Sequence, residues 1–272
     1  VEGAVAGQYH FADQLPVEAF RRVTGSGSAK PILMMPYGFP YLVTNTKQGL
    51  FADKKIRQAF QLALNESEML GAAFGDEKFF RATPAHFPQG SPFHSMAGEK
   101  VYNKADAASA KKLLAEAKYD GTPVRILNSK QYEFHHAMAL VMAENLKAAG
   151  FKTQLDVVDW ATLVQRRADP ALYEVYITHS SFYPEPMLSP PQLGAGAPGW
   201  WDSPAKNAAI SAFNAESDPV KRGALWAKVQ EVVYDEVPYI RVGEFAALCA
   251  GSMRLTGYAP MPMPAFWNVS LG

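Results

Sequence analysis

The segment 124–158 constrains the fold most, because it has the pattern of a strand, a helix and a second strand joined by short connections. Residues 124–128 and 151–158 have strand character, and between them an apolar stripe at helical spacing stops at Gly150. A strand, a crossover helix and a strand almost always form a right-handed unit with parallel strands. The segment therefore predicts a sheet that contains parallel neighbours.

Other helix and strand patterns extend this prediction to a mixed α/β fold. Apolar residues at steps of three and four predict helices after Asp53, Asp106 and Asp218, each of which can cap a helix. We expect the first of these helices to end near Asn65 and the last to stop before Pro238. Further strand patterns lie at 41–46, 173–178 and 239–247. No apolar run approaches the roughly 18 residues needed to span a bilayer.

The ends of two predicted strands indicate a binding site. Residues 129–132 follow the strand 124–128, and residues 179–185 follow the strand 173–178. Ligands of α/β sheets bind outside the carboxyl ends of parallel strands, where successive loops converge. If the two strands run the same way, both loops open onto one edge, and that edge is the predicted site.

Composition and motifs exclude several classes of function. The 272 residues carry 26 Lys+Arg and 26 Asp+Glu, so the formal net charge of 0 gives no broad attraction to nucleic acid or to an anionic membrane. The single cysteine excludes an internal disulfide and any multi-cysteine metal site. No phosphate-binding loop, dinucleotide fingerprint or Gly-x-Ser-x-Gly elbow occurs, so we expect no cofactor and no acyl-transfer nucleophile.

The histidines and the cysteine suggest structural roles rather than a metal site. His135 and His136 are adjacent, and adjacent helical residues point about 100° apart, so the two rings cannot easily chelate one ion. We expect both on the surface or boundary of a helix. His179 is a partial exception because it lies at the predicted site, and Cys249 is expected to be a small core residue.

Two unusual loops leave alternatives open. The Met-Pro run at 261–264 favours packing onto the core, whereas the pair Trp200-Trp201 is equally compatible with packing and with recognition. If these loops were exposed, the chain could be an interaction or chaperone-like module. A third possibility is an α/β enzyme of hydrolase type, which would depend on His135, His136 or His179.

Four segments in order resemble the carboxyl-terminal half of the large periplasmic solute-binding proteins (family 5) that serve ABC importers of peptides, nickel, opines and related solutes. Residues 41–45 and 51–60 resemble the family's strand ending in Asn and its F-x-D-x-x-V-R-Q-A helix start. Residues 107–121 resemble A-x-x-L-L-x-E-A-G-Y-x-D-G, with Lys118 in place of a glycine. Residues 143–152 and 218–238 are similar to two further helix patterns of the family.

The resemblance implies a type II, cluster C-like fold: a periplasmic-binding-protein lobe with a mixed sheet flanked by helices. It implies a protein without enzymatic activity that encloses a peptide or other small polar solute between two lobes and delivers it to a membrane permease. It also implies an exported, periplasmic protein, monomeric at full length, whose signal peptide is absent from this chain.

Domain boundaries follow from the same resemblance. Residues 1–41 would be a first-lobe remnant and crossover, 42–237 the second ligand-binding lobe, and 238–272 the return to the first lobe. Without the rest of that lobe, the apolar residues of 245–250 and the pair Phe266-Trp267 are expected to lack cover.

The expected ligand-binding residues come from the two loops and from Trp200. Peptide-binding members carry W-x-x-D-Y-x-x-P, whose Asp pairs with the peptide ammonium; here His179 takes the Trp position and Phe182 the Asp position. Recognition of a free amino terminus is therefore not favoured unless Glu185 or a first-lobe residue substitutes. Lys130 is the candidate for a ligand carboxylate. The full predicted set is Lys130, Tyr132, His179, Ser180, Ser181, Phe182, Tyr183, Glu185 and Trp200.

Overall fold

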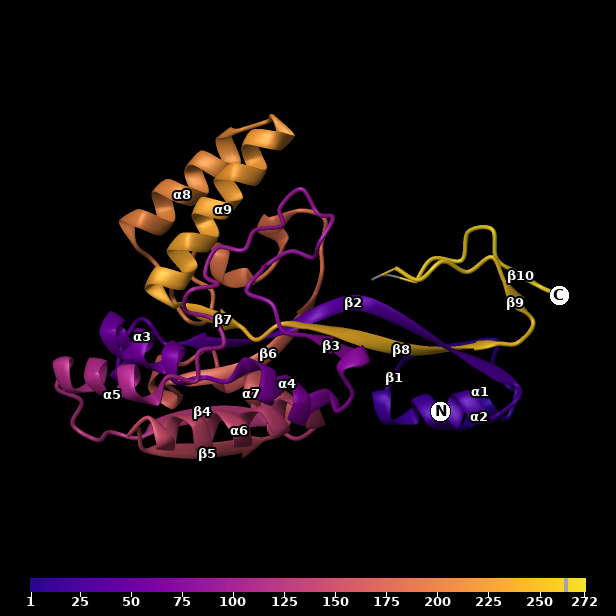
Figure 1. Ribbon diagram of the computed structural model, residues 1–272, viewed down its shortest axis with the longest axis horizontal. Helices are drawn as coiled ribbons and strands as arrows, with labels where there is room; N and C mark the ends of the chain where they lie inside the picture. The colour runs from indigo at the N-terminus through magenta and orange to yellow at the C-terminus, as the bar shows by residue number, and fades with distance from the viewer. Residues whose placement is uncertain (262–263) are drawn as a thin grey trace.

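A mixed sheet organises the chain in a computed structural model that describes residues 1–261 and 264–272. Within these residues the strand order is β1-β8-β2-β6-β4-β5, with β3 paired to β8 and β7 paired to β2 (Figure 1). The strands are β1 (Phe11–Leu15), β2 (Ala29–Thr44), β3 (Phe80–Arg81), β4 (Val124–Ser129), β5 (Thr153–Val158), β6 (Val175–Ser181), β7 (Tyr239–Arg241) and β8 (Glu244–Ser252). A separate two-stranded sheet joins β9 (Leu255–Thr256) to β10 (Ser270–Leu271).

The predicted crossover is present. β4 lies parallel to β5, with Val124 opposite Thr153, and helix α6 (Glu133–Ala148) connects them. β4 also lies parallel to β6, so the ends of β4 and β6 open onto the same edge, as predicted. β2 is antiparallel to β6, β7 and β8, which makes the sheet mixed.

Three helices begin at the aspartates that the sequence predicts as caps. Asp53, Asp106 and Asp218 each accept a hydrogen bond from a backbone N–H in the first turn of the helix that follows. The first helix ends before Asn65, and Asn65 caps a further helix that the sequence patterns did not predict. The helices are α1 (Glu2–Val5), α2 (Phe20–Gly25), α3 (Lys54–Ala63), α4 (Glu66–Phe74), α5 (Ala107–Glu116), α6, α7 (Trp160–Arg166), α8 (Pro204–Ala215) and α9 (Pro219–Glu236).

Short 3₁₀ helices occupy the connections. They are η1 (Val17–Ala19), η2 (Leu50–Ala52), η3 (Glu77–Phe79), η4 (Pro170–Leu172), η5 (Pro186–Leu188) and η6 (Pro191–Leu193). No helix of the described ranges combines the length and the apolar character needed to cross a bilayer.

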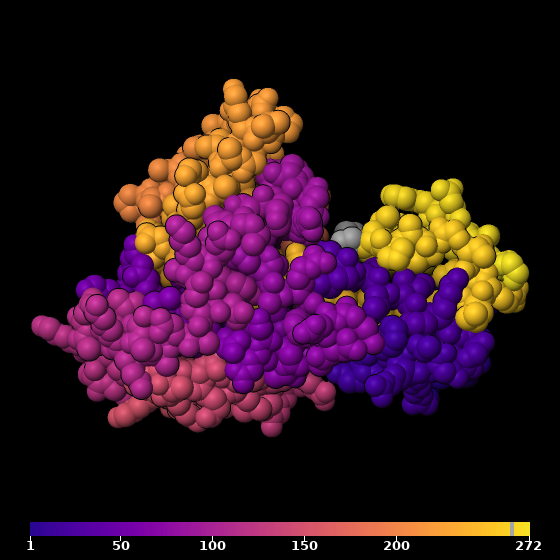
Figure 2. All heavy atoms as spheres, in the orientation of Figure 1, coloured from indigo at the N-terminus to yellow at the C-terminus, as the bar shows by residue number. Residues whose placement is uncertain are grey.

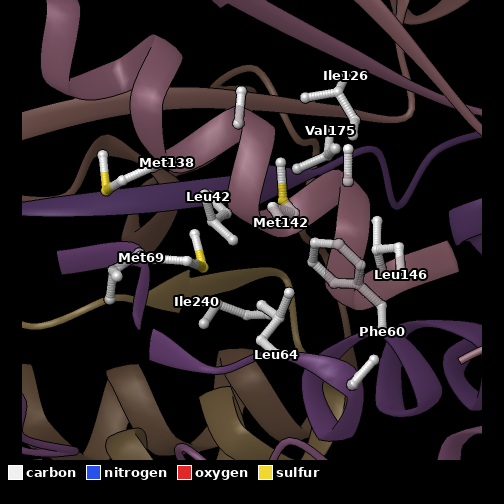
Figure 3. Close-up of a cluster of buried hydrophobic side chains, with 14 of the residues drawn as sticks. Leu42, Phe60, Leu64, Met69, Ile126, Met138, Met142, Leu146, Val175 and Ile240 are labelled. Atoms are coloured by element: carbon white, nitrogen blue, oxygen red, sulfur yellow. The ribbon is translucent and has the colours of Figure 1, made fainter. Parts of the chain in front are cut away.

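Two hydrophobic cores cover the two faces of the sheet. The first core packs one face against α3, α4, α5 and α6, and Figure 3 shows Leu42 of β2 and Ile126 of β4 among helix residues there. The second core packs the opposite face against α7, α8 and α9 and includes Val43 and Leu127, the next residues along the same strands. This alternation is the period of two expected of strands buried on both faces. Each fully buried apolar side chain contributes about 1.5–3 kcal/mol.

β2 and β8 continue past the main sheet as a long antiparallel pair. The pairing reaches from Gly38 opposite Phe245 to Ala29 opposite Ser252, where the N-terminal helices and both chain ends lie (Figure 1). Figure 2 shows the N-terminal and C-terminal residues together at this end of the molecule, away from α8 and α9. The division into 1–41, 42–237 and 238–272 stays a prediction.

The expectation that apolar side chains would be exposed is wrong for residues 245–250 and correct for Phe266 and Trp267. Residues 245–250 are all buried, because β8 lies inside the sheet and its side chains pack into hydrophobic clusters with Phe74, Met34 and Val23. Phe266 and Trp267 are 51% and 79% exposed. Of the Met-Pro run, Pro262 and Met263 lie outside the described residues.

Candidate ligand-binding site

Three of the predicted site residues line one cavity of about 690 Å³, called here the His179 cavity. Lys130 and Tyr132 reach it from the connection after β4, and His179 reaches it from β6. The other walls come from the N-terminal segment, β2, α4, α6 and β8. They include Gln14, Leu15, Pro16, Val17, Glu18, Tyr37, Phe74, Glu133, Phe134 and Phe245.

Strand alternation places two other predicted residues on the opposite face. β6 continues to Ser181, so Ser180 and Phe182 point away from the His179 cavity. Ser180 Oγ lies 2.7 Å from Ser189 Oγ. The Phe182 ring packs 5.4 Å from the Phe39 ring in the second core.

A buried arginine accompanies Phe182. The guanidinium carbon of Arg241 lies 3.4 Å from the Phe39 ring centroid and 5.3 Å from that of Phe182. Its Nη1 donates a hydrogen bond of 2.7 Å to the His86 carbonyl. Phe182 therefore packs over an internal cation, a role that the sequence pattern did not indicate.

The remaining predicted residues do not join the His179 cavity. Ser181 is half-buried opposite Gly38 of β2, and the Tyr183 side chain is exposed. Arg222 of α9 donates two hydrogen bonds, of 2.8 and 3.0 Å, to the Glu185 carboxylate. Glu185 therefore already has a cationic partner within the chain, and its predicted role as a substitute for the missing Asp stays a prediction.

Trp200 lines a second, separate cavity of about 700 Å³. Its ring stacks on that of Tyr173 at 6.2 Å, and Lys47 Nζ lies 5.5 Å from its centroid. The adjacent Trp201 is buried in the second core and donates a hydrogen bond to Glu236. Both rings line this cavity, but Trp201 is buried whereas Trp200 is half-buried.

His135 is fully buried, so its expected place on the surface or boundary is wrong. Its Nε2 lies 3.0 Å from Nδ1 of His179. His136 is half-buried, as expected, with Nδ1 2.9 Å from Oδ1 of Asn128. The spacing of His135 from Met138 and Met142, by three and then four residues, places it on the core face of α6 and could have revealed its burial.

Aromatic rings surround the histidine pair. The rings of Tyr132, Phe134, Phe245 and Trp160 lie 4.8, 5.2, 6.2 and 6.3 Å from that of His179. Burial lowers the pKa of His179 to about 4. Burial, with a smaller effect of His179, also holds the pKa of His135 well below its usual value. Both imidazoles are therefore neutral at pH 7.

Several cavity residues were missed because they come from distant segments. Tyr37 lies in the part of β2 that precedes the predicted strand, and Phe74 lies in the unpredicted helix α4. Phe245 was expected to lack cover, yet it forms part of the cavity wall. Cys249 is buried as expected, and its Sγ donates a hydrogen bond to Asp13. Among the described residues, no three His, Cys, Asp or Glu side chains gather to hold a metal ion.

Comparison with known proteins identifies the family. Residues 2–199 match the family described as bacterial extracellular solute-binding proteins, family 5 Middle. The chain is 26% identical over 236 residues to a probable peptide ABC transporter periplasmic-binding protein, y4tO, of Sinorhizobium fredii, a match covering 83% of this chain and 44% of that protein. It is 22% identical over 276 aligned positions to the glutathione-binding protein GsiB of Salmonella choleraesuis, covering 96% of this chain and 52% of that protein.

Solved structures agree with the fold. The ABC transporter substrate-binding protein CtaP of Listeria monocytogenes superposes with a TM-score of 0.84 at 19% identity, covering 94% of this chain and 53% of that one. The expected fold class is thereby confirmed. The chain spans about half the length of these relatives. By its match over most of its length, the chain belongs to family 5 of the bacterial extracellular solute-binding proteins.

Proposed function

We propose that the chain forms the hinge-side half of the solute cleft in the substrate-binding component of an ABC importer. It would capture a peptide or another small polar solute outside the cytoplasmic membrane and deliver it to a membrane permease. Family membership supports this proposal, as do relatives named for peptide transport and for glutathione binding. We further propose that residues 42–237 form one lobe, that the flanking segments belong to the other, and that the complete protein acts as a monomer.

The position of the His179 cavity carries the proposal. Its walls include Gln14 and Glu18 from the N-terminal segment, Tyr37 and Phe245 from the long β2–β8 pair, and His179 from the main sheet. A small rotation about the β2–β8 pair would change the distance between these walls. Closure of two bodies about such connecting strands is the usual way in which binding proteins enclose a ligand.

The cavity chemistry favours a ligand that is apolar over much of its surface. Several aromatic rings line the cavity, and the charged side chains Glu18, Lys130 and Glu133 of its lining are exposed. A free peptide ammonium has no carboxylate from Phe182, and Glu185 is already paired with Arg222. Neither position of the loop after β6 thus supplies a free carboxylate to an amino terminus, and the carboxylates that do line the cavity, Glu18 and Glu133, are exposed.

The two other functions have no comparable support. An enzyme would depend on the histidines, but His135 and His179 are neutral and bond to each other among aromatic rings. His136 bonds to Asn128. A chaperone-like module would rest on the Met-Pro run, part of which lies outside the described residues, and on Trp201, which is buried.

Calorimetric titration of the complete protein, with both halves of the cleft present, against a panel of short peptides, some blocked at the amino end and some free, tests the proposal. We expect at least one peptide to bind. Tyr132→Ala removes an aromatic wall of the His179 cavity and should weaken binding about tenfold, which is about 1.4 kcal/mol. Trp200→Ala in the second cavity is the matched control and should change affinity by less than about twofold. Failure of every peptide to bind, or sensitivity to Trp200 alone, would contradict the proposal.

A further inference from the structure

His135 and His179 share a hydrogen bond, and its direction depends on which ring nitrogens carry hydrogen. Nε2 of His135 and Nδ1 of His179 are 3.0 Å apart, so one ring donates and the other accepts. A neutral imidazole carries a single hydrogen, on one of its two nitrogens. The choice of donor therefore fixes the tautomer of both rings.

The other nitrogen of His135 decides the direction. Nδ1 of His135 is buried and has no hydrogen-bond partner among the described residues. If His135 carried its hydrogen on Nδ1, a buried N–H donor would be left without an acceptor. With the hydrogen on Nε2, only an acceptor lone pair is unused, and unpaired buried acceptors are more common than unpaired buried donors. Nε2–H of His135 therefore donates to Nδ1 of His179.

This direction leaves the hydrogen of His179 on Nε2. The ring's hydrogen bond within the described residues is made through Nδ1. Nε2 is not among the buried atoms that lack a partner, and the open space beside this ring is the His179 cavity. An N–H donor of fixed orientation therefore opens onto the proposed ligand cleft.

We propose that His135 is a positioning residue that holds His179 in its Nε2–H tautomer, and that this N–H recognises an uncharged carbonyl oxygen, the amide of a peptide-like solute. This inference rests on the proposed function, because it assigns a ligand group to the same cleft. It gives the polar pair among these aromatic rings a function at the cavity.

The surroundings favour an amide over a carboxylate. His179 is neutral at pH 7, because burial lowers its pKa to about 4, so it brings no positive charge to the cavity. The charged residues that line the cavity are Lys130, Glu18 and Glu133, so its lining carries more negative than positive charge. A carboxylate within aromatic walls would lose hydration without a dedicated cationic partner, whereas an amide carbonyl needs only a neutral donor. A ligand lacking the carbonyl would leave Nε2–H unpaired, which makes the contact selective.

Nuclear magnetic resonance of the chain labelled with ¹⁵N-histidine tests the tautomer without any ligand. Long-range nitrogen–proton correlations at pH 7 report which ring nitrogen carries the hydrogen. We expect Nε2–H for both His135 and His179, with His10→Gln as an exposed control for assignment. His135→Phe keeps a ring but removes the donor, so the His179 signals should become those of a mixture of tautomers. His135→Gln can donate through its amide and should restore the single tautomer. A wild-type His179 that carries its hydrogen on Nδ1 would overturn the proposal.

A binding experiment tests the recognition step. The probe is N-acetyl-alanyl-phenylalanyl-alanine amide, which is uncharged at both ends, together with analogues in which one amide at a time is replaced by an alkene. We expect one alkene analogue to bind about tenfold more weakly to the wild type. We expect His135→Phe to weaken the parent peptide by a similar factor and to remove the difference between that peptide and the analogue. His135→Gln should recover binding to within about threefold.

The two hypotheses fail in different ways. Peptide binding by the wild type that responds equally to His135→Phe and His135→Gln, or to no alkene replacement, would overturn the role of the pair and leave the proposed function standing. Absence of binding by any peptide would contradict the proposed function and the recognition step together, while the tautomer measurement would still decide the role of His135.

Discussion

At the scale of single residues, the buried carboxyl of Glu66 is expected to make the stability of this chain depend on pH. Glu66, the first residue of α4, is fully buried, and neither of its carboxylate oxygens accepts a hydrogen bond from a described residue. Burial raises the pKa of Glu66 to about 8, so the carboxyl is largely protonated in the folded protein at pH 7. In the unfolded chain the same group ionises near its ordinary value of 4.5.

Glu66 should make the folded state less stable as pH rises. Between pH 4.5 and about 8 the folded chain holds a proton that the unfolded chain has lost, so the free energy of unfolding falls with pH through this window. The slope is at most about 1.4 kcal/mol per pH unit. Urea denaturation at several pH values should show that Glu66→Gln removes much of this slope. Glu68→Gln, on the exposed side of the same helix, is the control and should keep it. Parallel pH profiles for wild type and Glu66→Gln would contradict the assignment.

Residue roles could be predicted from sequence where the neighbours are local. The three capping aspartates were found because a cap depends on the next few residues. Phe182 was assigned to the site because the predicted strand stopped at 178, whereas β6 continues to Ser181 and turns Phe182 toward Arg241. Arg241 lies 59 positions further along the chain, and no local pattern links it to Phe182.

At the scale of elements, the close packing of β2 against β6 depends on one glycine. Gly38 lies opposite Ser181, and the register between β2 and β8 is irregular between Met34 and Gly38. A Cβ added at Gly38 would collide with the carbonyl oxygen of Ser180 and would lie 3.1 Å from the Phe245 ring. The sequence could not reveal this constraint, because it arises from partners in β6 and β8. For the same reason the predicted strand at 41–46 captured only the end of a strand of 16 residues.

Gly38→Ala should therefore destabilise the chain by about 1–3 kcal/mol, since backbone atoms of β6 must move to admit the methyl group. Gly71 provides a matched control within α4, where an added Cβ meets no atom within 4 Å. Gly71→Ala should raise stability by about 0.5–1 kcal/mol through its better helix propensity. Urea denaturation measures both changes. Equal effects of the two substitutions would show that β2 and β6 do not approach each other in this way.

At the scale of the whole molecule, β2 connects a region in which it has neighbouring strands on both sides to a region in which it has one. Residues 38–44 are paired with β6 on one side and with β7 or β8 on the other over much of their length. Residues 29–34 are paired with β8 alone. Sequence patterns located the crossover and the edge where β4 and β6 end, because periodicity and chain order determine both. The cavity itself could not be predicted, since its walls come from six separated segments.

Hydrogen exchange followed by mass spectrometry should show this difference along a single strand. Amides of 41–43 should exchange slowest, because these residues are paired with β6 on one side and with β7 on the other. Amides of 29–34 should exchange faster, and those of β9 and β10, which pair only with each other, faster still. Equal protection along the whole of β2 would contradict the proposed hinge at the β2–β8 pair.

The alternation along β6 has a consequence for how this strand can change in evolution. Insertion or deletion of a single residue between Val175 and His179 would exchange the two faces of everything after it. His179 would then face the second core and His135 would lose its partner. A deletion would bring Ser180 to the cavity position of His179, and an insertion would bring Thr178 or the added residue there. A change of two residues would preserve both faces. Insertions or deletions within this strand must therefore add or remove an even number of residues if the side chains after them are to keep their faces.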